Sequence, residues 1–310
     1  MGPLREDTAN LTQSAGLILN PAAGKGAARR RLQAITQSFA AVGVYDVKHT
    51  TQQGDEERVT MEALDAGWKT IVAVGGDGTC SRVADTILKS GAECALGVVP
   101  AGTGNDFAKT LGVASYTPAQ VAALVASPAR TRIDVGLADG RHFINSCGFG
   151  FDASVLEATG RVKFLKGDAL YIYAALMQLF TYRGFPIAID GGVRELAKDL
   201  LMVTVSNGRY LGGAFHIAPE ASVLDGALDV CVVRDANVLE RVRLFATAFR
   251  GTHGRLASVR TFRTPGITLS FPSPPAIEID GELRQSRSSE VRIECVPHAL
   301  TVIAAPDARL

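Results

Sequence analysis

Short apolar segments alternate with longer segments of helical spacing through the first 130 residues. The predicted strands are residues 16–19, 45–50, 69–74 and 95–99. The first predicted helix presents Leu32, Ile35, Phe39 and Val42 on one face, and a second covers residues 55–66. Helical spacing also follows the third and fourth strands. Strands that alternate with helices in this way predict a parallel sheet that is covered on both faces.

The pattern changes after about residue 131, where short apolar segments follow one another closely. The predicted strands of this half are residues 133–137, 142–145, 201–205, 228–233, 267–271, 276–279, 291–295 and 300–303. Glycine, proline and aspartate turns between them are typical of an antiparallel sandwich. Two helices are predicted as well, over residues 169–180 and 238–250. The first of these carries an apolar stripe that either guides an acyl chain or packs in the core.

Composition narrows the class of protein. The 310 residues correspond to about two domains, which need no disulfide or metal to hold a core. A net charge of +1 lacks the basic excess of a general nucleic-acid binder. Five scattered cysteines without a CxxC pair indicate a reducing cytoplasm. No apolar run approaches the roughly 18 residues of a membrane span, so the chain is predicted to be cytoplasmic, at most peripheral at the inner face of a membrane.

Two glycine-rich loops carry the candidate chemistry. Residues 75–79 follow the third predicted strand and residues 100–106 follow the fourth, so both lie at the carboxyl edge of the sheet, where ligands bind. Glycines allow close approach of the backbone, and N–H groups at a helix N-terminus attract anions. The pattern predicts a polyphosphate ligand, with Asp77 and Asp106 holding Mg²⁺ beside Asn105.

The common nucleotide motifs are absent. The first loop cannot extend to GxGxxG because Cys80 and Ser81 follow it, and the second fails in the same way at Phe107. Residues 20–26 do not fit GxxxxGK[ST]. A Rossmann dehydrogenase and a Walker NTPase are therefore disfavoured.

The ordered motifs resemble the diacylglycerol kinase catalytic-domain family, which includes sphingosine and ceramide kinases. The motifs of the first half are Asn20-Pro-x-x-Gly24, Gly75-Gly-Asp-Gly-Thr79 and Pro100-x-Gly-Thr-Gly-Asn-Asp-Phe-Ala108. Those of the second half are Gly148-Phe-Gly-Phe-Asp152, Ile217-Ala-Pro219, Leu224-Asp-Gly-x-Leu-Asp-Val230 and Ile279-Asp-Gly-Glu282. The resemblance covers roughly residues 15–305 and is to the bacterial soluble type.

This resemblance implies an α/β + β fold. A parallel-sheet, nucleotide-binding α/β domain would comprise residues 15–132 and 297–310. A β-sandwich domain for the lipid would comprise residues 133–296, with the active site in the cleft between the two. The implied activity is ATP- and Mg²⁺-dependent phosphorylation of a hydroxyl of a diacylglycerol- or sphingoid-like lipid. The implied partner is a lipid at a membrane surface, and a homodimer is left open. Because a net charge of +1 gives little long-range attraction, contact with the membrane is predicted to rely on local apolar or basic patches near Lys163, Lys166 and Arg183.

The resemblance also assigns roles to individual residues. The implied nucleotide ligands are Asn20 near the adenosine end, Gly75, Gly76, Asp77, Gly78 and Thr79, Gly102, Thr103, Gly104 and Asn105, and Glu282. Asp77 and Asp106 would approach the catalytic Mg²⁺. A structural Mg²⁺ loop would comprise Asp225, Ser222, which is a poor ligand, and the carbonyl of Ala227.

Two features leave alternatives open. Asp280 corresponds to the general base proposed in bacterial members, whereas Asp77 is the rival base because a similar loop has that role in NAD kinases. Arg82 stands where the family often has glutamate, which leaves room for a catalytically weak nucleotide sensor. A soluble kinase of the NAD-kinase type shares the first loop. The second loop and the Asp-Gly-x-Leu-Asp turn speak against that type.

Overall fold

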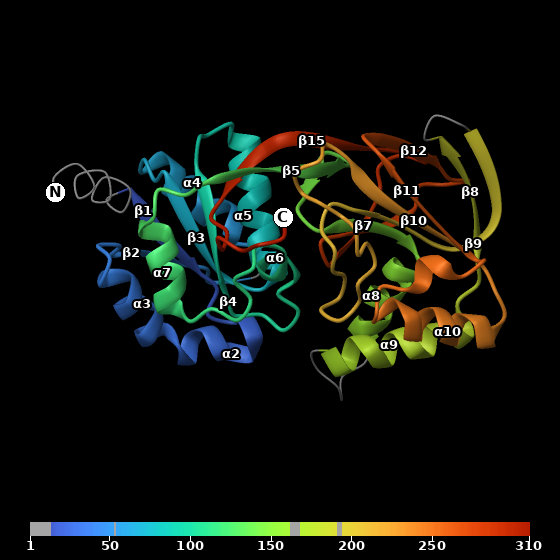
Figure 1. The fold of residues 1–310 in the computed structure, drawn as a ribbon, viewed down its shortest axis with the longest axis horizontal. Helices are drawn as coiled ribbons and strands as arrows, with labels where there is room; N and C mark the ends of the chain where they lie inside the picture. The colour runs from blue at the N-terminus through green and yellow to red at the C-terminus, as the bar shows by residue number, and fades with distance from the viewer. Residues whose placement is uncertain (1–13, 53, 162–167, 191–193) are drawn as a thin grey trace. The chain divides into compact units, whose positions relative to one another are not determined.

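The computed structural model describes residues 14–52, 54–161, 168–190 and 194–310, and the chain forms two compact units. Unit 1 ends at Ile133 and resumes at His298, and unit 2 is formed by Asp134–Pro297. Two strands carry the chain across these boundaries: β5 (Thr131–Ala138) on the way out and β15 (Glu290–Val302) on the way back. Figure 1 shows the path of the chain from blue to red.

Unit 1 is built on the predicted parallel sheet. Its strands are β1 (Ala15–Leu19), β2 (Asp46–His49), β3 (Thr70–Gly75) and β4 (Ala95–Pro100), in the order β2-β1-β3-β4. The end of β15 adds to β4 in parallel. β1, β3 and β4 are buried along their whole length. Strands covered on both faces read as uninterrupted apolar runs, which explains why the sequence located them well.

Helices cover both faces of this sheet (Figure 1). One face carries α2 (Ala23–Arg30), α3 (Leu32–Ala40) and α7 (Pro118–Ala126), and the other carries α4 (Glu56–Asp65) and α5 (Asp77–Ser90). Ile35 and Phe39 of α3 pack with Leu17 and Val72 in one core cluster. The single helix predicted around residues 32–42 is wrong in its extent: α2 precedes it, and α3 ends before Val42.

The strand order creates a switch point between β1 and β3. The chain passes from β1 to β2 on one side and then returns to β3 on the other side of β1. Open α/β sheets bind ligands outside the carboxyl ends of the strands at such a point. Asn20 follows β1 and Gly76 follows β3 at this edge. The fold therefore places two of the predicted motifs side by side.

Unit 2 is the predicted antiparallel sandwich. Besides β5 and β15 its strands are β6 (Arg141–Phe143), β7 (Ser146–Gly150), β8 (Phe185–Asp190), β9 (Arg194–Ser206), β10 (Leu228–Arg234), β11 (Val259–Thr264), β12 (Gly266–Ser270), β13 (Ala276–Ile279) and β14 (Glu282–Gln285). The first half of β9 pairs with β8, and its second half pairs with β7 on one side and β10 on the other. Phe149, Val203, Val230, Leu269 and Ile293 belong to one buried cluster, which is the core of the sandwich.

One boundary differs from the prediction. Residues 291–295 and 300–303 are not separate strands, because β15 runs without interruption over 13 residues. Its start pairs with β12 and its end pairs with β4. Pro297 is exposed within it, and a strand tolerates proline where no ladder hydrogen bond needs its N–H. The break in the apolar pattern around Pro297 therefore marks the point where β15 passes between the two units, and it is not a turn.

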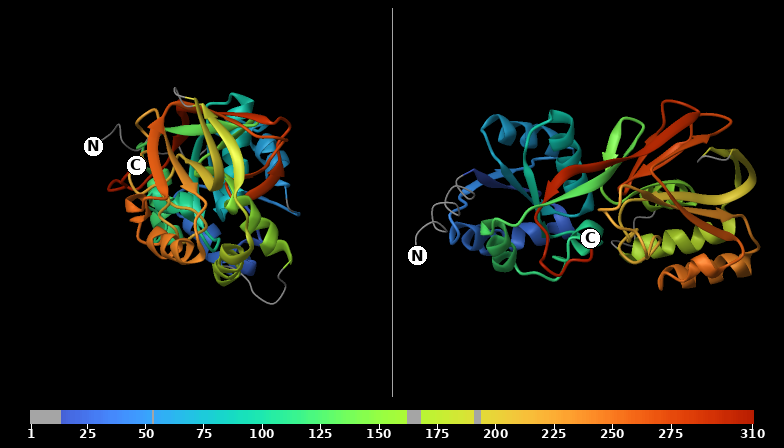
Figure 2. Two further views of the ribbon diagram at one scale, coloured as in Figure 1. Left: turned by 90° about the vertical axis from the view of Figure 1, so that its right-hand side faces the viewer. Right: turned by 45° about the horizontal axis from the view of Figure 1, so that its top comes forward.

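Helices cover one side of the strands of unit 2, as Figure 2 also shows. They are α8 (Phe151–Arg161), α9 (Asp168–Thr181) and α10 (Val238–Ala248), so both predicted helices are confirmed. Met202 and Val233 alternate with the core residues of β9 and β10 and pack with Phe151 and Leu244 in a second cluster. In the described ranges, no helix combines the length and the apolar character that crossing a bilayer requires.

The first turn of α8 buries a carboxylate, that of Asp152. Its Oδ2 accepts a hydrogen bond of 2.5 Å from Thr204 Oγ1. Burial raises the pKa of Asp152 from 3.8 to about 6, although the hydrogen bond from Thr204 opposes the shift. The folded chain therefore holds this proton more tightly than the unfolded chain does. The free energy of unfolding is expected to fall as the pH rises from about 4 to above 6.

We expect the substitution Asp152→Asn to raise the thermal midpoint at pH 8, since it removes a charge that the fold disfavours. A shift of about two pKa units corresponds to at most about 3 kcal/mol of unfolding free energy. The gain should vanish near pH 4, where wild-type Asp152 is protonated when folded. Circular dichroism melts between pH 4 and pH 8 measure this. A gain of the same size at every pH would show that the charge of Asp152 costs nothing.

Candidate active site

The two glycine loops press their backbones together at the carboxyl ends of β3 and β4. A Cβ atom built on Gly102 would lie only 2.4 Å from Gly76 Cα, and one built on Gly76 would lie 3.0 Å from Gly102 Cα. Ala101 N donates to Gly75 O at 2.9 Å and extends the β3–β4 pairing into the loops. A side chain at residue 102 would force the two loops apart, and one at residue 76 would be tightly crowded, so glycine at both positions allows this close contact.

Side chains then fasten the second loop. Asn105 Oδ1 accepts from Gly102 N at 2.9 Å, and Asn105 Nδ2 donates to Gly102 O at 3.0 Å. Asn105 itself has a φ of 53°, a conformation that asparagine tolerates better than most residues. Asp77 Oδ1 accepts from Phe107 N at 3.0 Å and ties the first loop to α6 (Asp106–Thr110). Asn105 thus shapes the loop from inside, while Gly104 and Thr103 form its outer part.

The first loop leads directly into the N-terminus of α5. Gly76 is its N-cap residue and makes no side-chain capping bond, and Asp77 and Gly78 form the first turn. A helix of 14 residues carries a positive partial charge at this end, with backbone N–H groups directed outward. Gly76, Asp77 and Gly78 are all partly accessible to solvent. This edge has the features of a phosphate site.

A buried carboxylate supports the loop from below. Glu56 Oε1 accepts from Asn20 Nδ2 at 3.2 Å and from Thr79 Oγ1 at 3.3 Å, and Asn20 Nδ2 also donates to Thr79 Oγ1 at 3.1 Å. Thr79 is buried, and a Cβ on Gly75 would collide with it. Glu56 had no distinguishing sequence pattern, because it reads as an ordinary first residue of α4. The hydroxyl of Thr79 therefore holds the β1 and β3 ends together.

The acidic residues at this edge fit a metal that arrives with the nucleotide. Asp106 is buried and forms an ion pair of 2.8 Å with Lys109, which leaves Asp77 as the more accessible carboxylate. No group of three or more metal-ligating side chains occurs in the part of the chain that the structure describes. Mg²⁺ is commonly held by one or two carboxylates together with substrate phosphates. The donor set thus suits Mg²⁺ bound to a polyphosphate.

In unit 2, the carboxylate of Asp280 forms hydrogen bonds with backbone N–H groups. It accepts hydrogen bonds from the N–H groups of Ile144 (2.9 Å), Asn145 (2.8 Å) and Ser146 (3.0 Å). Asp280 is 4% exposed and has a φ of 47° in the turn between β13 and β14. A carboxylate offers about four lone pairs, and three of them face these donors. Asp280 therefore fixes the segment before β7, a task that its position in a turn did not reveal.

Glu282 lies two residues farther along the same turn. It is partly accessible and forms an ion pair of 3.1 Å with the buried Arg141. The distance in sequence between Arg141 and Glu282 prevented this pair from being recognised in the pattern. Asp280 and Glu282 belong to unit 2, whereas the loops of β3 and β4 belong to unit 1.

The predicted structural Mg²⁺ loop contains an arginine partner. Arg263 Nη1 lies 3.4 Å from Asp225 Oδ2, and Arg263 Nε lies 3.4 Å from Asp229 Oδ1. Ser222 Oγ accepts from Leu224 N, and Asp225 Oδ1 accepts from Ala227 N. A cation at this loop would have to compete with the guanidinium of Arg263. The metal site at Ser222, Asp225 and Ala227 stays a prediction.

A helix N-terminus with the features of a phosphate site, on a parallel sheet that is followed by an antiparallel sandwich, is compatible with a phosphotransferase, and comparison with known proteins gives the family. Residues 14–138 match the model described as "Diacylglycerol kinase catalytic domain", and residues 145–304 match "YegS C-terminal NAD kinase beta sandwich-like domain". The chain belongs to this lipid kinase family, and it is a phosphotransferase that acts on an alcohol group.

Individual relatives agree with this assignment. A "Probable lipid kinase YegS-like" of Stenotrophomonas maltophilia is 33% identical over 91% of this chain and 93% of its own. A "Diacylglycerol kinase" of Bacillus subtilis is 29% identical over 86% of this chain and 89% of its own. The crystal structure of a diacylglycerol kinase from Bacillus anthracis superposes with a TM-score of 0.71 and 25% identity, over 95% of this chain and 97% of the other. The predicted family and fold class are confirmed, and the family implies that ATP is the phosphoryl donor.

The contact between the two loops can be tested with Gly102→Ala. The added Cβ would lie 2.4 Å from Gly76 Cα, so the loops must separate and the backbone N–H groups lose their arrangement. We expect the affinity for a non-hydrolysable Mg²⁺–ATP analogue to fall more than tenfold in calorimetry. Gly254→Ala is the matched control, because its Cβ would meet nothing closer than 3.8 Å. Wild-type affinity in Gly102→Ala would show that the contact does not shape the site.

Proposed function

We propose that this protein transfers the γ-phosphoryl group of Mg²⁺–ATP to a hydroxyl of a diacylglycerol- or sphingoid-like lipid. The observation that carries this proposal is the close Gly76–Gly102 backbone contact at the N-terminus of α5, because such an arrangement suits phosphate groups better than an apolar ligand. Gly75 to Thr79 and Gly102 to Asn105 would surround the phosphates, with Asn20 near the adenosine end. Mg²⁺, when bound, would neutralise charge on the transferring group.

Features of unit 2 support a lipid acceptor. Phe151, Phe215 and Leu244 line a small apolar cavity of about 50 Å³ in this unit, with Asp152 at its wall, and this cavity would have to widen to admit an acyl chain. Close by, α9 and α10 expose large apolar side chains, among them Phe180 (60% exposed) and Leu239 (79% exposed). Scattered exposed apolar residues are ordinary, but adjoining ones on packed helices suit contact with acyl chains.

A membrane surface is the partner that we propose for this helix face. Arg183 is exposed just after α9, in reach of anionic headgroups. Lys163 and Lys166, the other members of the predicted basic patch, lie outside the described residues.

Arg82, the residue of α5 that differs from the family pattern, lies close to Gly54. Gly54 donates its N–H to Glu56, and Glu56 in turn binds Asn20 and Thr79 beneath the first glycine loop. We propose that Arg82 affects the position of the first glycine loop. In the alternative function, Arg82 abolishes turnover and the protein is a nucleotide sensor.

The acceptor can be identified with a panel at fixed Mg²⁺–ATP. We expect ATP consumption with dioctanoylglycerol or sphingosine in mixed micelles, and none above background with NAD. Asp77→Ala should abolish turnover while its melting curve stays within a few degrees of wild type, because Asp77 is partly accessible at a loop. Turnover with NAD alone would favour the NAD-kinase type. ATP binding without turnover on any acceptor would favour the sensor.

The general base, which would accept the proton of the acceptor hydroxyl, is still to be assigned. We propose that a carboxylate at the β13–β14 hairpin, Asp280 or Glu282, deprotonates the acceptor hydroxyl, and Asp77 of the first glycine loop is the rival candidate. Asp280 binds three backbone N–H groups, whereas Glu282 pairs with Arg141. A base needs a lone pair directed at the substrate, so the bonds of Asp280 favour Glu282 for this step.

Asp280→Asn and Glu282→Gln separate these tasks. An asparagine amide would direct N–H groups at backbone donors, so Asp280→Asn should lose about 1–3 kcal/mol of unfolding free energy. Glu282→Gln keeps an oxygen acceptor for Arg141 but removes the charge that balances this buried guanidinium, so it should lower the melting temperature and slow turnover by about 10²–10⁴. Urea denaturation and steady-state kinetics on both variants measure this. A stable Asp280→Asn that is slow, beside a fully active Glu282→Gln, would return the role of base to Asp280.

A further inference from the structure

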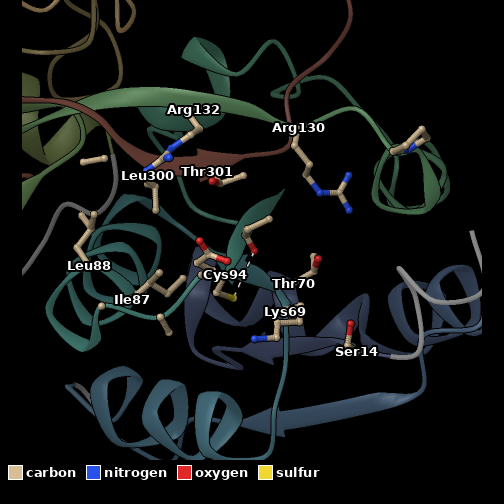
Figure 3. Close-up of a pocket in the computed structure, with 16 residues that line it drawn as sticks. Ser14, Lys69, Thr70, Ile87, Leu88, Cys94, Arg130, Arg132, Leu300 and Thr301 are labelled. Atoms are coloured by element: carbon tan, nitrogen blue, oxygen red, sulfur yellow. Dashed lines mark hydrogen bonds between the residues drawn. The ribbon is translucent and has the colours of Figure 1, made fainter. Parts of the chain in front are cut away.

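A second cavity lies in unit 1, at the edge of the sheet opposite the glycine loops. It measures about 930 Å³, within the size range of small-molecule sites. Lys69 precedes β3 and Cys94 precedes β4, and both residues line it (Figure 3). The strands between this cavity and the loops are six residues long, roughly 20 Å. The cavity is therefore separate from the candidate active site.

Cationic side chains gather around this cavity. Lys69, Arg130 and Arg132 line it, and Glu93 is the carboxylate among its lining residues. Arg130 directly precedes β5 and Arg132 is its second residue, and in Figure 3 Lys69 lies on the opposite side of the cavity, below them. Arg130 has a structural task, since its guanidinium donates to the carbonyls of Val125 (3.1 Å) and Ala129 (2.9 Å) at the end of α7.

Lys69 and Arg132 have no such task. Within the described part of the chain, neither side chain forms a hydrogen bond or an ion pair, and both are exposed. Together with Arg130 and Glu93, they leave two positive charges in excess at the cavity. A phosphate monoester carries a charge of about −1.5 to −2 at pH 7, which balances this excess. Lysine and arginine are also the side chains that most often bind phosphate.

The remaining lining is partly apolar. Leu88, from the last turn of α5, is partly accessible and forms an apolar wall together with the small exposed parts of Ile87 (3% exposed) and Leu300 of β15 (1% exposed). Thr70 and Thr301 also line the cavity, and in Figure 3 Arg132 lies beside Leu300. A bare inorganic anion would leave such a wall without a contact. A ligand with a phosphate group and an apolar body would use both parts.

We propose that this cavity is a second anion site and binds a phosphate monoester that carries an apolar body. The phosphate lies between Lys69 and Arg132, and the apolar body contacts Leu88 and its neighbours. A phosphorylated lipid belongs to this chemical class. The link to the enzyme's own product rests on the proposed function, whereas the binding does not.

The chain contains a reporter for this site. Trp68, its single tryptophan, directly precedes Lys69, is 8% exposed and packs against Gly16. Titration of the full-length protein with dihexanoyl phosphatidic acid, below its micellar concentration, should give a saturable change in tryptophan fluorescence. In Lys69→Gln/Arg132→Gln the apparent Kd should rise at least tenfold. Both side chains are exposed, so the melting curve of the variant should match wild type.

Matched controls test whether binding requires both the phosphate group and the apolar body of the ligand. Arg250→Gln/Arg255→Gln removes two exposed charges in unit 2 and should bind within twofold of wild type. Inorganic phosphate and uncharged dihexanoylglycerol should each bind at least tenfold more weakly than the phosphatidic acid. Equal binding of inorganic phosphate would overturn the apolar part of the ligand, and equal binding of dihexanoylglycerol would overturn the anionic part.

Two results would overturn the site itself: no saturable change in the wild type, or an unchanged Kd in Lys69→Gln/Arg132→Gln. The titration involves no turnover, so a failure of the proposed kinase activity would leave its result intact. Conversely, an active lipid kinase that gives no fluorescence titration would retain its function and lose this second site.

Discussion

The contact between Gly76 and Gly102 is the constraint on which the nucleotide half of the molecule depends. Two loops from neighbouring strands can meet backbone to backbone only where neither residue has a side chain. That approach lets the N-terminus of α5 and the second loop face one ligand. Asn105, Asp77 and the Asn20–Thr79–Glu56 cluster then hold the loops in place. In the function that we propose, the charges of ATP would meet donors that are already oriented, and phosphoryl transfer is largely catalysed in this way.

Unit 2 uses a carboxylate in a different way. Asp280 binds three consecutive backbone N–H groups and joins the β13–β14 turn to the segment before β7. Such a bond set orders the turn that leads into Glu282 at the start of β14, and Glu282 in turn forms an ion pair with Arg141 of β6. Asp152, by contrast, is buried beside apolar side chains and holds its proton unusually tightly. Two aspartates in motifs of the same family thus have different physical environments.

The sequence was most informative where burial is complete. β1, β3 and β4 are apolar throughout because both of their faces are covered, and the glycine loops follow them at once. It was least informative about where elements begin and end. β15 continues through Pro297, where the pattern predicted two strands, and the helical region after β1 divides at Arg31 into α2 and α3. The partners of Asp280 lie about 135 residues away along the chain, so no local pattern could indicate them.

Amide hydrogen exchange with and without a non-hydrolysable Mg²⁺–ATP analogue tests the central claim most directly. If the two loops form the phosphate cradle, exchange should slow at residues 76–79 and 102–105 together when the analogue binds. Residues 69–70 and 93–95, at the other ends of the same strands, should change little. Protection at one loop without the other, or none at either while the analogue is bound, would contradict the account.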